Sequence, residues 1–549
     1  MRARLALALL TMSLLPLAGC MSEGDAPVAP GGRDADGNLV FHEDWAERAL
    51  PYSDHDHFDP AQHKGLSTPN FVERGWDPLI SEHYGRSAGG YLCGDSVDTG
   101  DRKLAAVHGI STDVAFELVD VTVAEAPVLL GEFIMPRSAS RDVALTPDGT
   151  HVAVAISTPD ANDANYYAAA STATTPEELA LEEAGVAYWR SSCNDGPVPV
   201  TGPADLARLA GLPALSGPEQ DVPWPPGVML VSVADPKAPT VSGYYSLPVL
   251  GAHSVYAGEL EGSTLVIAAV VNLVAATSNF WFFEVGEQGL VLLSQYVERA
   301  DTAGAPLING HNDAVVQKHP ITGQPLAYLA NWHQGVTLLD MTDPRLPVRV
   351  SNWNNSPGFA NADLVQDGSG NVHEAIPIPG TWGGKHYMVV GQEILDHPGG
   401  TPSGLVYVID TTDPAAPKEV ARWTLPVDVV WDSGGVFSPH YVSIHNSTVF
   451  VAHYHAGVWA IDLSGLLDGS VDEADRHPPA IGVYLPTNVS PQPPPDGSYD
   501  WTPTIMDANS LGNGDLVIWD CTSGIYVVTF DDSQPAPPRV FQGWDDSLA

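Results

Sequence analysis

The sequence predicts an all-β protein, a seven-bladed β-propeller that follows an export signal and a flexible tether. Three observations predict this fold. A strand–turn–strand segment recurs along the chain, and a second recurring segment places a histidine at the start of a strand. The composition is also rich in turn residues, with 52 glycines and 48 prolines. Such repeats indicate that each copy forms one blade and buries its core against its neighbours.

The first twenty residues have the layout of an export signal. Arg2 and Arg4 precede an apolar run, residues 5–15, that is too short to cross a membrane. The next residues, Leu17-Ala18-Gly19-Cys20, resemble the lipobox of bacterial lipoproteins. This resemblance implies a signal peptide over residues 1–19, cleavage before Cys20 and lipidation of its thiol. An ordinary secretory signal that happens to contain a cysteine is the alternative.

Two segments separate the signal from the propeller. Residues 20–45 are rich in Gly, Pro and Asp without an apolar period, which predicts an acidic tether. Residues 46–90 contain one tryptophan and little apolar alternation, and we expect an ordered strap that lies on the propeller. His55, His57 and Asp59 within this strap could hold a metal, but a solvated polar loop is the simpler interpretation.

The charge of the chain restricts its partners. The formal net charge is −44, and an acidic surface repels nucleic acid and anionic lipid. We therefore expect an exported monomer that is anchored to the cell envelope, at the outer membrane or cell surface, through lipid on Cys20. Its partner would be an extracytoplasmic ligand or protein that the sequence does not identify.

An Asp-Pro turn carries the first repeat. Residues 228–239 (VMLVSVADPKAP), 336–347 (VTLLDMTDPRLP) and 405–417 (LVYVIDTTDPAAP) each end a β-branched strand in Asp-Pro, and residues 118–127 are a degraded copy. Proline after aspartate ends a strand and starts a turn. The Asp-Pro pairs at Asp235, Asp343 and Asp413 resemble the LVIVD repeat, a propeller-blade motif of secreted and surface proteins. The resemblance covers most of residues 91–545 and implies a surface lipoprotein with a propeller fold, without implying an activity.

The repeats divide residues 91–549 into seven blades. The predicted ranges are 91–135, 139–247, 252–299, 310–354, 372–424, 439–485 and 502–545, and a miscounted copy would give six or eight blades. The second blade carries an insertion at about 158–226. In it, Thr175 and Pro176 have the pattern of a helix start, which predicts a small helical element.

Histidines mark where chemistry would take place. In a propeller, the start of each innermost strand and the loop between the second and third strands reach the same face. Imidazole and carboxylate groups that meet there can bind copper, zinc or iron. The candidate metal ligands are His253, His311, His373 and His440 at strand starts, with His333, Glu393 and His455 in the loops.

Two interpretations of the histidines stay open. They could bind a ligand or partner at a His-rich channel mouth, with or without a metal, or they could serve a metal-dependent extracytoplasmic enzyme that resembles an oxidoreductase. A purely structural role is also open, in which each imidazole bonds to the backbone of its own blade or the next. No Gly-x-Ser-x-Gly context and no glycine-rich phosphate loop supports another chemistry.

Four cysteines are present. With Cys20 assigned to lipid, Cys93, Cys193 and Cys521 remain, and thiols outside the cytoplasm tend to oxidise. Cys93 and Cys193 fall in adjacent blades, which predicts a disulfide between them. Cys93–Cys521 is the alternative if the last blade closes the ring against the first.

The lipobox generates a prediction about location. The wild-type protein should partition with membranes, and mature protein should begin at a lipidated Cys20. The Cys20→Ala variant should lose membrane association or stay unprocessed, as fractionation and mass spectrometry would reveal. A wild-type protein that is cleaved yet soluble without detergent would contradict the anchor.

Overall fold

The computed structural model describes fifteen segments of the chain. They are residues 59–82, 91–109, 114–135, 139–157, 226–247, 251–272, 277–287, 289–298, 313–332, 334–354, 372–393, 404–425, 437–467, 478–491 and 503–532. The predicted signal peptide, tether and insertion, with Cys20 and Cys193, lie outside these residues.

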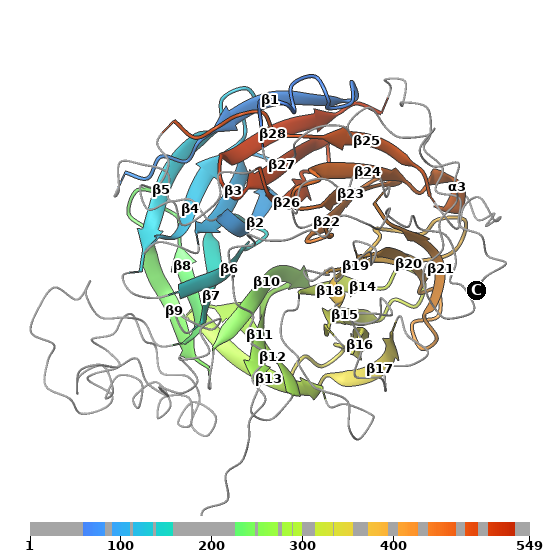
Figure 1. Cartoon of the computed structure of the whole chain (residues 1–549). Coiled ribbons are helices and arrows are strands. Elements are labelled where there is room, and N and C mark those ends of the chain that lie inside the picture. The colour runs from blue at the N-terminus through green and yellow to red at the C-terminus, as the bar shows by residue number, and fades with distance from the viewer. Residues whose placement is uncertain are drawn as a thin grey trace, which may run out of the picture.

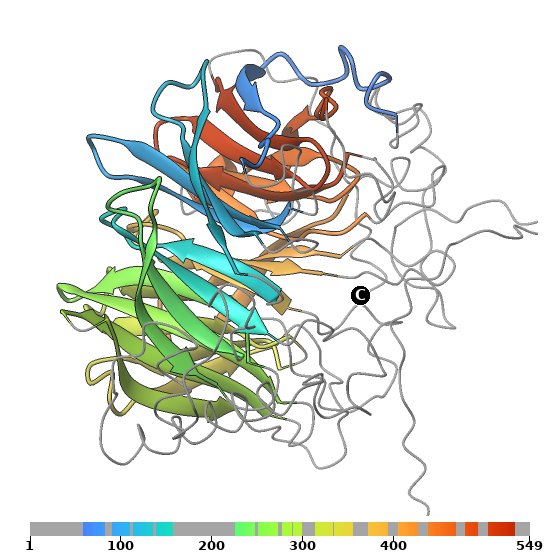
Figure 2. The same ribbon diagram turned by 90° about the vertical axis from the view of Figure 1, so that its left-hand side faces the viewer.

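Seven four-stranded antiparallel sheets surround one axis (Figure 1), which confirms the predicted seven-bladed propeller. In six of the sheets the innermost strand comes first in the chain (Figure 1). Figure 2 shows the sheets side by side in a view turned by 90°. Blade 1 comprises β2 (Tyr91–Asp98), β3 (Lys103–Gly109), β4 (Val114–Asp120) and β5 (Val128–Ile134). Blade 2 comprises β6 (Ala139–Leu145), β7 (His151–Ser157), β8 (Gly227–Ser232) and β9 (Thr240–Ser246). Blade 3 comprises β10 (Ala252–Leu260), β11 (Ser263–Asn272), β12 (Thr277–Gly286) and β13 (Gly289–Glu298).

The remaining blades follow the same order. Blade 4 comprises β14 (Ala314–Lys318), β15 (Pro325–Ala330), β16 (Val336–Asp340) and β17 (Val348–Trp353). Blade 5 comprises β18 (Val372–Pro377), β19 (Tyr387–Gln392), β20 (Val406–Asp410) and β21 (Lys418–Trp423). Blade 6 comprises β22 (Val442–His445), β23 (Thr448–Ala452), β24 (Val458–Asp462) and β25 (Ala480–Tyr484), with the short helix α3 (Ser464–Leu467) after β24. Blade 7 contains β26 (Ile505–Ser510), β27 (Asp515–Asp520) and β28 (Gly524–Phe530).

The ring is closed by a strand from the N-terminal side of the propeller. β1 (Phe71–Asp77) pairs antiparallel with β28 and forms the outer strand of blade 7 (Figure 1). This strand belongs to residues 46–90, for which the sequence predicted a strap. Its pairing joins the N-terminal and C-terminal ends of the propeller, so blade 7 contains one strand that precedes blade 1 in the chain and three strands that follow blade 6.

The Asp-Pro repeat forms a turn that docks on the preceding blade. The carboxylate of Asp343 accepts a hydrogen bond from the backbone N–H of Arg345 (3.0 Å), and Asp413 accepts one from Ala415 (3.0 Å). The carbonyls of the two prolines then accept hydrogen bonds from serines of the blade before, Ser294 to Pro344 (2.7 Å) and Ser351 to Pro414 (2.6 Å). The repeat therefore specifies contacts between blades as well as a turn.

The Asp-Pro turn of blade 2 packs against blade 1 at a position where blade 1 needs a glycine. A Cβ atom at Gly131 would lie 1.9 Å from the carbonyl oxygen of Pro236, so no other residue fits without movement of the backbone.

Apolar side chains fill the interfaces between blades. Trp281, Trp423, Trp459 and Trp519 are among the largest fully buried side chains, and each pair of neighbouring sheets encloses a continuous apolar layer. Among the described helices, none is long and apolar enough to cross a bilayer.

Ring closure generates a stability prediction. Phe71 on β1 is buried against Phe450 and Phe530, with ring centroids 6.2 and 5.0 Å away, whereas Val72 on the same strand is 43% exposed. The Phe71→Ala variant should lose about 3–5 kcal/mol of stability because it leaves a cavity where the ring closes. Urea unfolding measures this loss. Val72→Ala is the matched control, and equal effects of the two variants would contradict the role of β1.

Candidate metal site at the channel mouth

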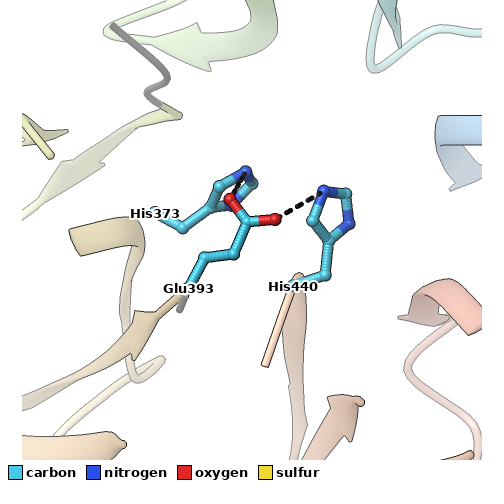
Figure 3. Close-up of side chains that lie close together, drawn as sticks. All are labelled: His373, Glu393 and His440. Carbon is cyan, nitrogen blue, oxygen red and sulfur yellow. Dashed lines mark ion pairs between the residues drawn. The ribbon is translucent and has the colours of Figure 1, made fainter. Parts of the chain in front are cut away.

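Three buried side chains from the predicted set meet near the axis: His373, Glu393 and His440 (Figure 3). One ligand atom from each lies within 4.8 Å of the other two. The Nε2 atom of His373 is 3.9 Å from Oε2 of Glu393, and Nε2 of His440 is 4.0 Å from Oε1. The two imidazole rings have centroids 4.6 Å apart.

The propeller topology explains why these residues converge. His373 lies on the inner strand β18, and Glu393 directly follows the second strand β19. His440 lies two residues before the inner strand β22 of the next blade. The start of an inner strand and the end of a second strand share one edge of a blade. Residues from two adjacent blades therefore meet at one end of the channel.

Hydrogen bonding fixes the orientation of His440. Its Nδ1 lies 2.6 Å from the carbonyl oxygen of Met506. Because a carbonyl oxygen only accepts, Nδ1 must donate the proton, and neutral His440 then carries a lone pair on Nε2. That lone pair lies on the side of Glu393, at a distance too long for a direct hydrogen bond. Two acceptors thus share one buried space.

Burial favours the uncharged form of both groups. Burial lowers the pKa of His440 to about 4, against a smaller opposing effect of the bond to Met506. Burial also raises the pKa of Glu393 to about 7, although the hydrogen bond from Tyr454 opposes this change. The Tyr454 hydroxyl donates to Oε1 of Glu393 and orients the carboxylate. Near neutral pH, His440 is a neutral imidazole and Glu393 is close to the pH at which it loses its proton.

Two aromatic residues beside the site have an unusual backbone conformation. Trp332 and Tyr454 have φ values of 45° and 44°, in the left-handed region that bulky residues rarely adopt. Each forms a β-bridge to the inner strand of the next blade, Trp332 to Val372 and Tyr454 to Ile505. These bridges hold the Trp332 ring centroid 6.2 Å from that of His373 and the Tyr454 ring centroid 5.1 Å from that of His440.

Five carboxyl groups, three of them buried and two half-buried, form a second layer, which we call the carboxylate belt. They come from the inner-strand regions of five blades and are Asp95, Asp142, Asp313, Glu374 and Asp507. Three of them accept hydrogen bonds from the inner strand of the following blade: Asp95 from the N–H of Leu145 (2.9 Å), Asp142 from that of Val255 (2.8 Å) and Glu374 from that of Val442. The belt therefore connects neighbouring blades around the axis.

Burial disfavours the charged form of these acids. It raises the pKa of Asp95 to about 6 and that of Asp313 to about 7, and it raises the pKa of Asp142, Glu374 and Asp507 well above the ordinary value. Neighbouring members of the belt raise these pKa values further.

The other predicted site residues are placed as follows. His253 on β10 and His455 in the loop after β23 are not part of the His373–Glu393–His440 group. The Nε2 atom of His455 lies 3.3 Å from the hydroxyl of Thr504. His311 and His333 lie outside the described residues. Cys93 and Cys521 are buried, and among the described residues neither forms a disulfide. Because Cys193 is outside the described residues, its disulfide with Cys93 stays a prediction.

Sequence reasoning missed the belt and Tyr441. The signal for the belt was present, since an acidic residue directly precedes a small or β-branched residue in Asp95-Ser96, Asp142-Val143 and Asp507-Ala508. Tyr441, directly after His440, carried no signal of its own, because only the fold brings its ring against His373.

Comparisons with known proteins give no family and no function for the chain. No protein-family model and no curated protein sequence matches the chain. Among solved structures, the chain is similar to U3-55K, with a TM-score of 0.41 and 10% identity over 80% of this chain and 95% of that one. It is also similar to the β-propeller domain of Cps50 (Swd1) from Myceliophteria thermophila, with a TM-score of 0.42 and 9% identity over 80% of this chain and 97% of that one.

The belt generates a prediction about pH and stability. Asp507 has a folded-state pKa above its unfolded value of about 3.9, so the native state binds the extra proton and stability falls as pH rises above about 4. Asp507→Asn keeps an acceptor for the N–H of Ala508 but cannot ionise. We expect the stability difference, variant minus wild type, to increase by about 1–3 kcal/mol between pH 4 and pH 8.

Urea unfolding of the metal-free protein across this pH range measures the difference. Asp101→Asn, at an exposed position, is the control and should leave the pH profile unchanged. A pH-independent difference between the Asp507 variant and the wild type would contradict the assignment of a buried, titrating Asp507.

Proposed function

We propose that this protein is an exported, lipid-anchored propeller that binds a transition metal ion at His373, Glu393 and His440. Its ligand or partner binds at the same channel mouth. One observation carries the proposal: the lone pair of His440 Nε2 and the carboxylate of Glu393 lie 4.0 Å apart in a buried site. Two acceptors so placed repel each other unless a proton or a cation lies between them. A metal ion satisfies both and takes His373 as a third ligand.

The ligand set favours a transition metal over calcium or magnesium. Two imidazole nitrogens and one carboxylate suit zinc, copper or iron, whereas calcium and magnesium prefer oxygen ligands alone. Bonds of about 2.0–2.1 Å in a tetrahedral arrangement place ligand atoms about 3.3 Å apart. The separations of 3.9 and 4.0 Å therefore need to shorten by less than 1 Å.

The hydrogen bonds that the candidate ligands make to their neighbours support this assignment. Metal-binding histidines usually donate their other N–H to a carbonyl or carboxylate, and metal-binding carboxylates are usually hydrogen-bonded. The contact of His440 with the Met506 carbonyl and the bond from Tyr454 to Glu393 have this arrangement. Both orient a ligand atom before any ion arrives.

A metal-dependent enzyme is the second candidate. Three protein ligands leave a coordination position open for a small molecule, as catalytic metal sites require. The strained Tyr454 places a hydroxyl beside Glu393, where it can serve as a proton donor.

The export of the protein and its lipid anchor are also part of the proposal, and they rest on the lipobox at Cys20.

Metal analysis tests the proposal. The wild-type protein should bind one equivalent of zinc or copper, and His373→Ala, Glu393→Gln and His440→Ala should each lower the affinity by at least about a hundredfold, because each removes one of three ligands. Titration calorimetry measures the affinity, and circular dichroism checks that each variant is folded.

A matched control comes from the same face of the propeller. His455 belongs to the predicted set but not to the three-residue group, so His455→Ala should bind the metal with unchanged affinity. Wild-type protein that binds neither zinc nor copper would contradict the proposal, as would equal losses of affinity in the control and the ligand variants.

A further inference from the structure

An arginine occupies in blade 2 the position that a candidate metal ligand occupies in blade 5. His373 is the extra residue of a β-bulge on β18, and Arg141 is the extra residue of a β-bulge on β6. Both strands are the innermost of their sheets, and they lie across the ring from each other (Figure 1). A bulge redirects one side chain of its strand. The same bulge at the same point of two blades therefore directs Arg141 and His373 to the same end of the channel.

The hydrogen bond of Arg141 supports this correspondence. The half-buried Arg141 donates its Nε–H to the hydroxyl of Ser157 (2.8 Å), the last residue of the second strand β7. In blade 5, Glu393 directly follows the second strand and lies 3.9 Å from His373. Both blades thus bring the bulge residue of the inner strand to the end of the second strand.

The end of β7 is built like a loop of the candidate metal site. Ser157 forms a β-bridge to Gly251, directly before the inner strand β10 of blade 3. Tyr454 forms the same kind of bridge to Ile505, the first residue of the inner strand of blade 7. The second strands of blades 2 and 6 are therefore joined to their following blades at one end of the channel, and Arg141 lies at that end.

The electrostatics of a third residue agree with this placement. His108 is fully buried near the end of the second strand of blade 1. Burial lowers the pKa of His108 to about 3, and the positive charges of Arg141 and His440 contribute to the decrease. Because the interaction between charges weakens with distance, Arg141 and His440 act from the same end of the channel.

We propose that Arg141 is the anion-binding residue of the channel mouth and that the site takes a small dicarboxylate. One carboxylate of this ligand binds the metal ion at its open coordination position, and the other binds the Arg141 guanidinium. The proposal rests on the proposed metal site and names the class of ligand that this site binds.

Charge and shape define this class. A divalent ion bound by Glu393 keeps one unit of positive charge, and Arg141 supplies a second across the ring. A molecule with a carboxylate at each end places one negative charge at each cation. The planar fork of a guanidinium also matches the two oxygens of a carboxylate. Inorganic phosphate concentrates its charge at one point, so it suits two separated cations less well.

Calorimetric titration of the zinc-loaded protein tests the proposal. The probes are straight-chain dicarboxylates of three to six carbons and, for each, the monoamide of the same length. We expect one length to bind best, and its monoamide to bind about 10- to 100-fold more weakly because it loses a charge-assisted contact with the guanidinium. The metal-free protein should bind neither probe, since the first carboxylate then has no metal ion.

Variants assign the effect to the arginine. Arg141→Gln should lower the affinity for the best dicarboxylate by about the same 10- to 100-fold factor and leave the affinities for zinc and for the monoamide unchanged. Arg141→Lys keeps the charge without the fork, so its loss should be smaller. The matched control is Arg102→Gln, at an exposed arginine paired with Asp120, which should bind every probe as the wild type does.

The outcomes separate the two proposals. Zinc binding without dicarboxylate binding, or dicarboxylate binding that Arg141→Gln leaves unchanged, would overturn the role of Arg141 while the metal site stands. Inorganic phosphate that binds more tightly than every dicarboxylate would overturn the ligand class. Failure to bind zinc or copper would contradict the proposed function and this inference together. If Arg141→Gln does not fold, Arg141→Lys and the wild-type preference for dicarboxylate over monoamide decide, and equal binding in both comparisons overturns the proposal.

Discussion

The channel depends on one repeated hydrogen bond, from the backbone N–H of an inner strand to a buried carboxylate of the preceding blade. Asp95, Asp142 and Glu374 make this bond to the blades that follow them. A carboxyl oxygen accepts this bond whether or not the group is ionised, so the bond fixes the height and angle of neighbouring inner strands. Equivalent positions on different blades can then meet at one axis.

This arrangement also determines the chemistry of the mouth. The carboxylate belt and the group formed by His373, Glu393 and His440 present acceptor atoms to a confined space, and burial makes uncompensated negative charge there unfavourable. A proton or a metal cation relieves this repulsion. The same geometry that holds the blades together therefore favours a cation at the channel mouth.

Much of the fold could be predicted because its signals are local. The Asp-Pro turns and alternating strands predict the blades, and the sheet from Ala314 to Trp353 lies within one predicted range. β1 could not be recognised, since FVERGWD has no strict alternation and only its distant partner β28 makes it a strand. The ligand types were predicted, but not which residues meet. Which side chains meet depends on the register of strand pairing within a blade, such as the bulge between Val372 and Glu374. It also depends on how neighbouring blades pack.

The central claim is that His373, Glu393 and His440 bind one metal ion. Diffraction from crystals of the copper- or zinc-loaded protein, collected at the absorption edge of the metal, tests it most directly. The account predicts one strong anomalous peak with both Nε2 atoms at about 2.0–2.1 Å and a Glu393 oxygen at about 2.0–2.2 Å. Anomalous peaks confined to surface sites, with the three side chains unchanged around an unligated space, would contradict it.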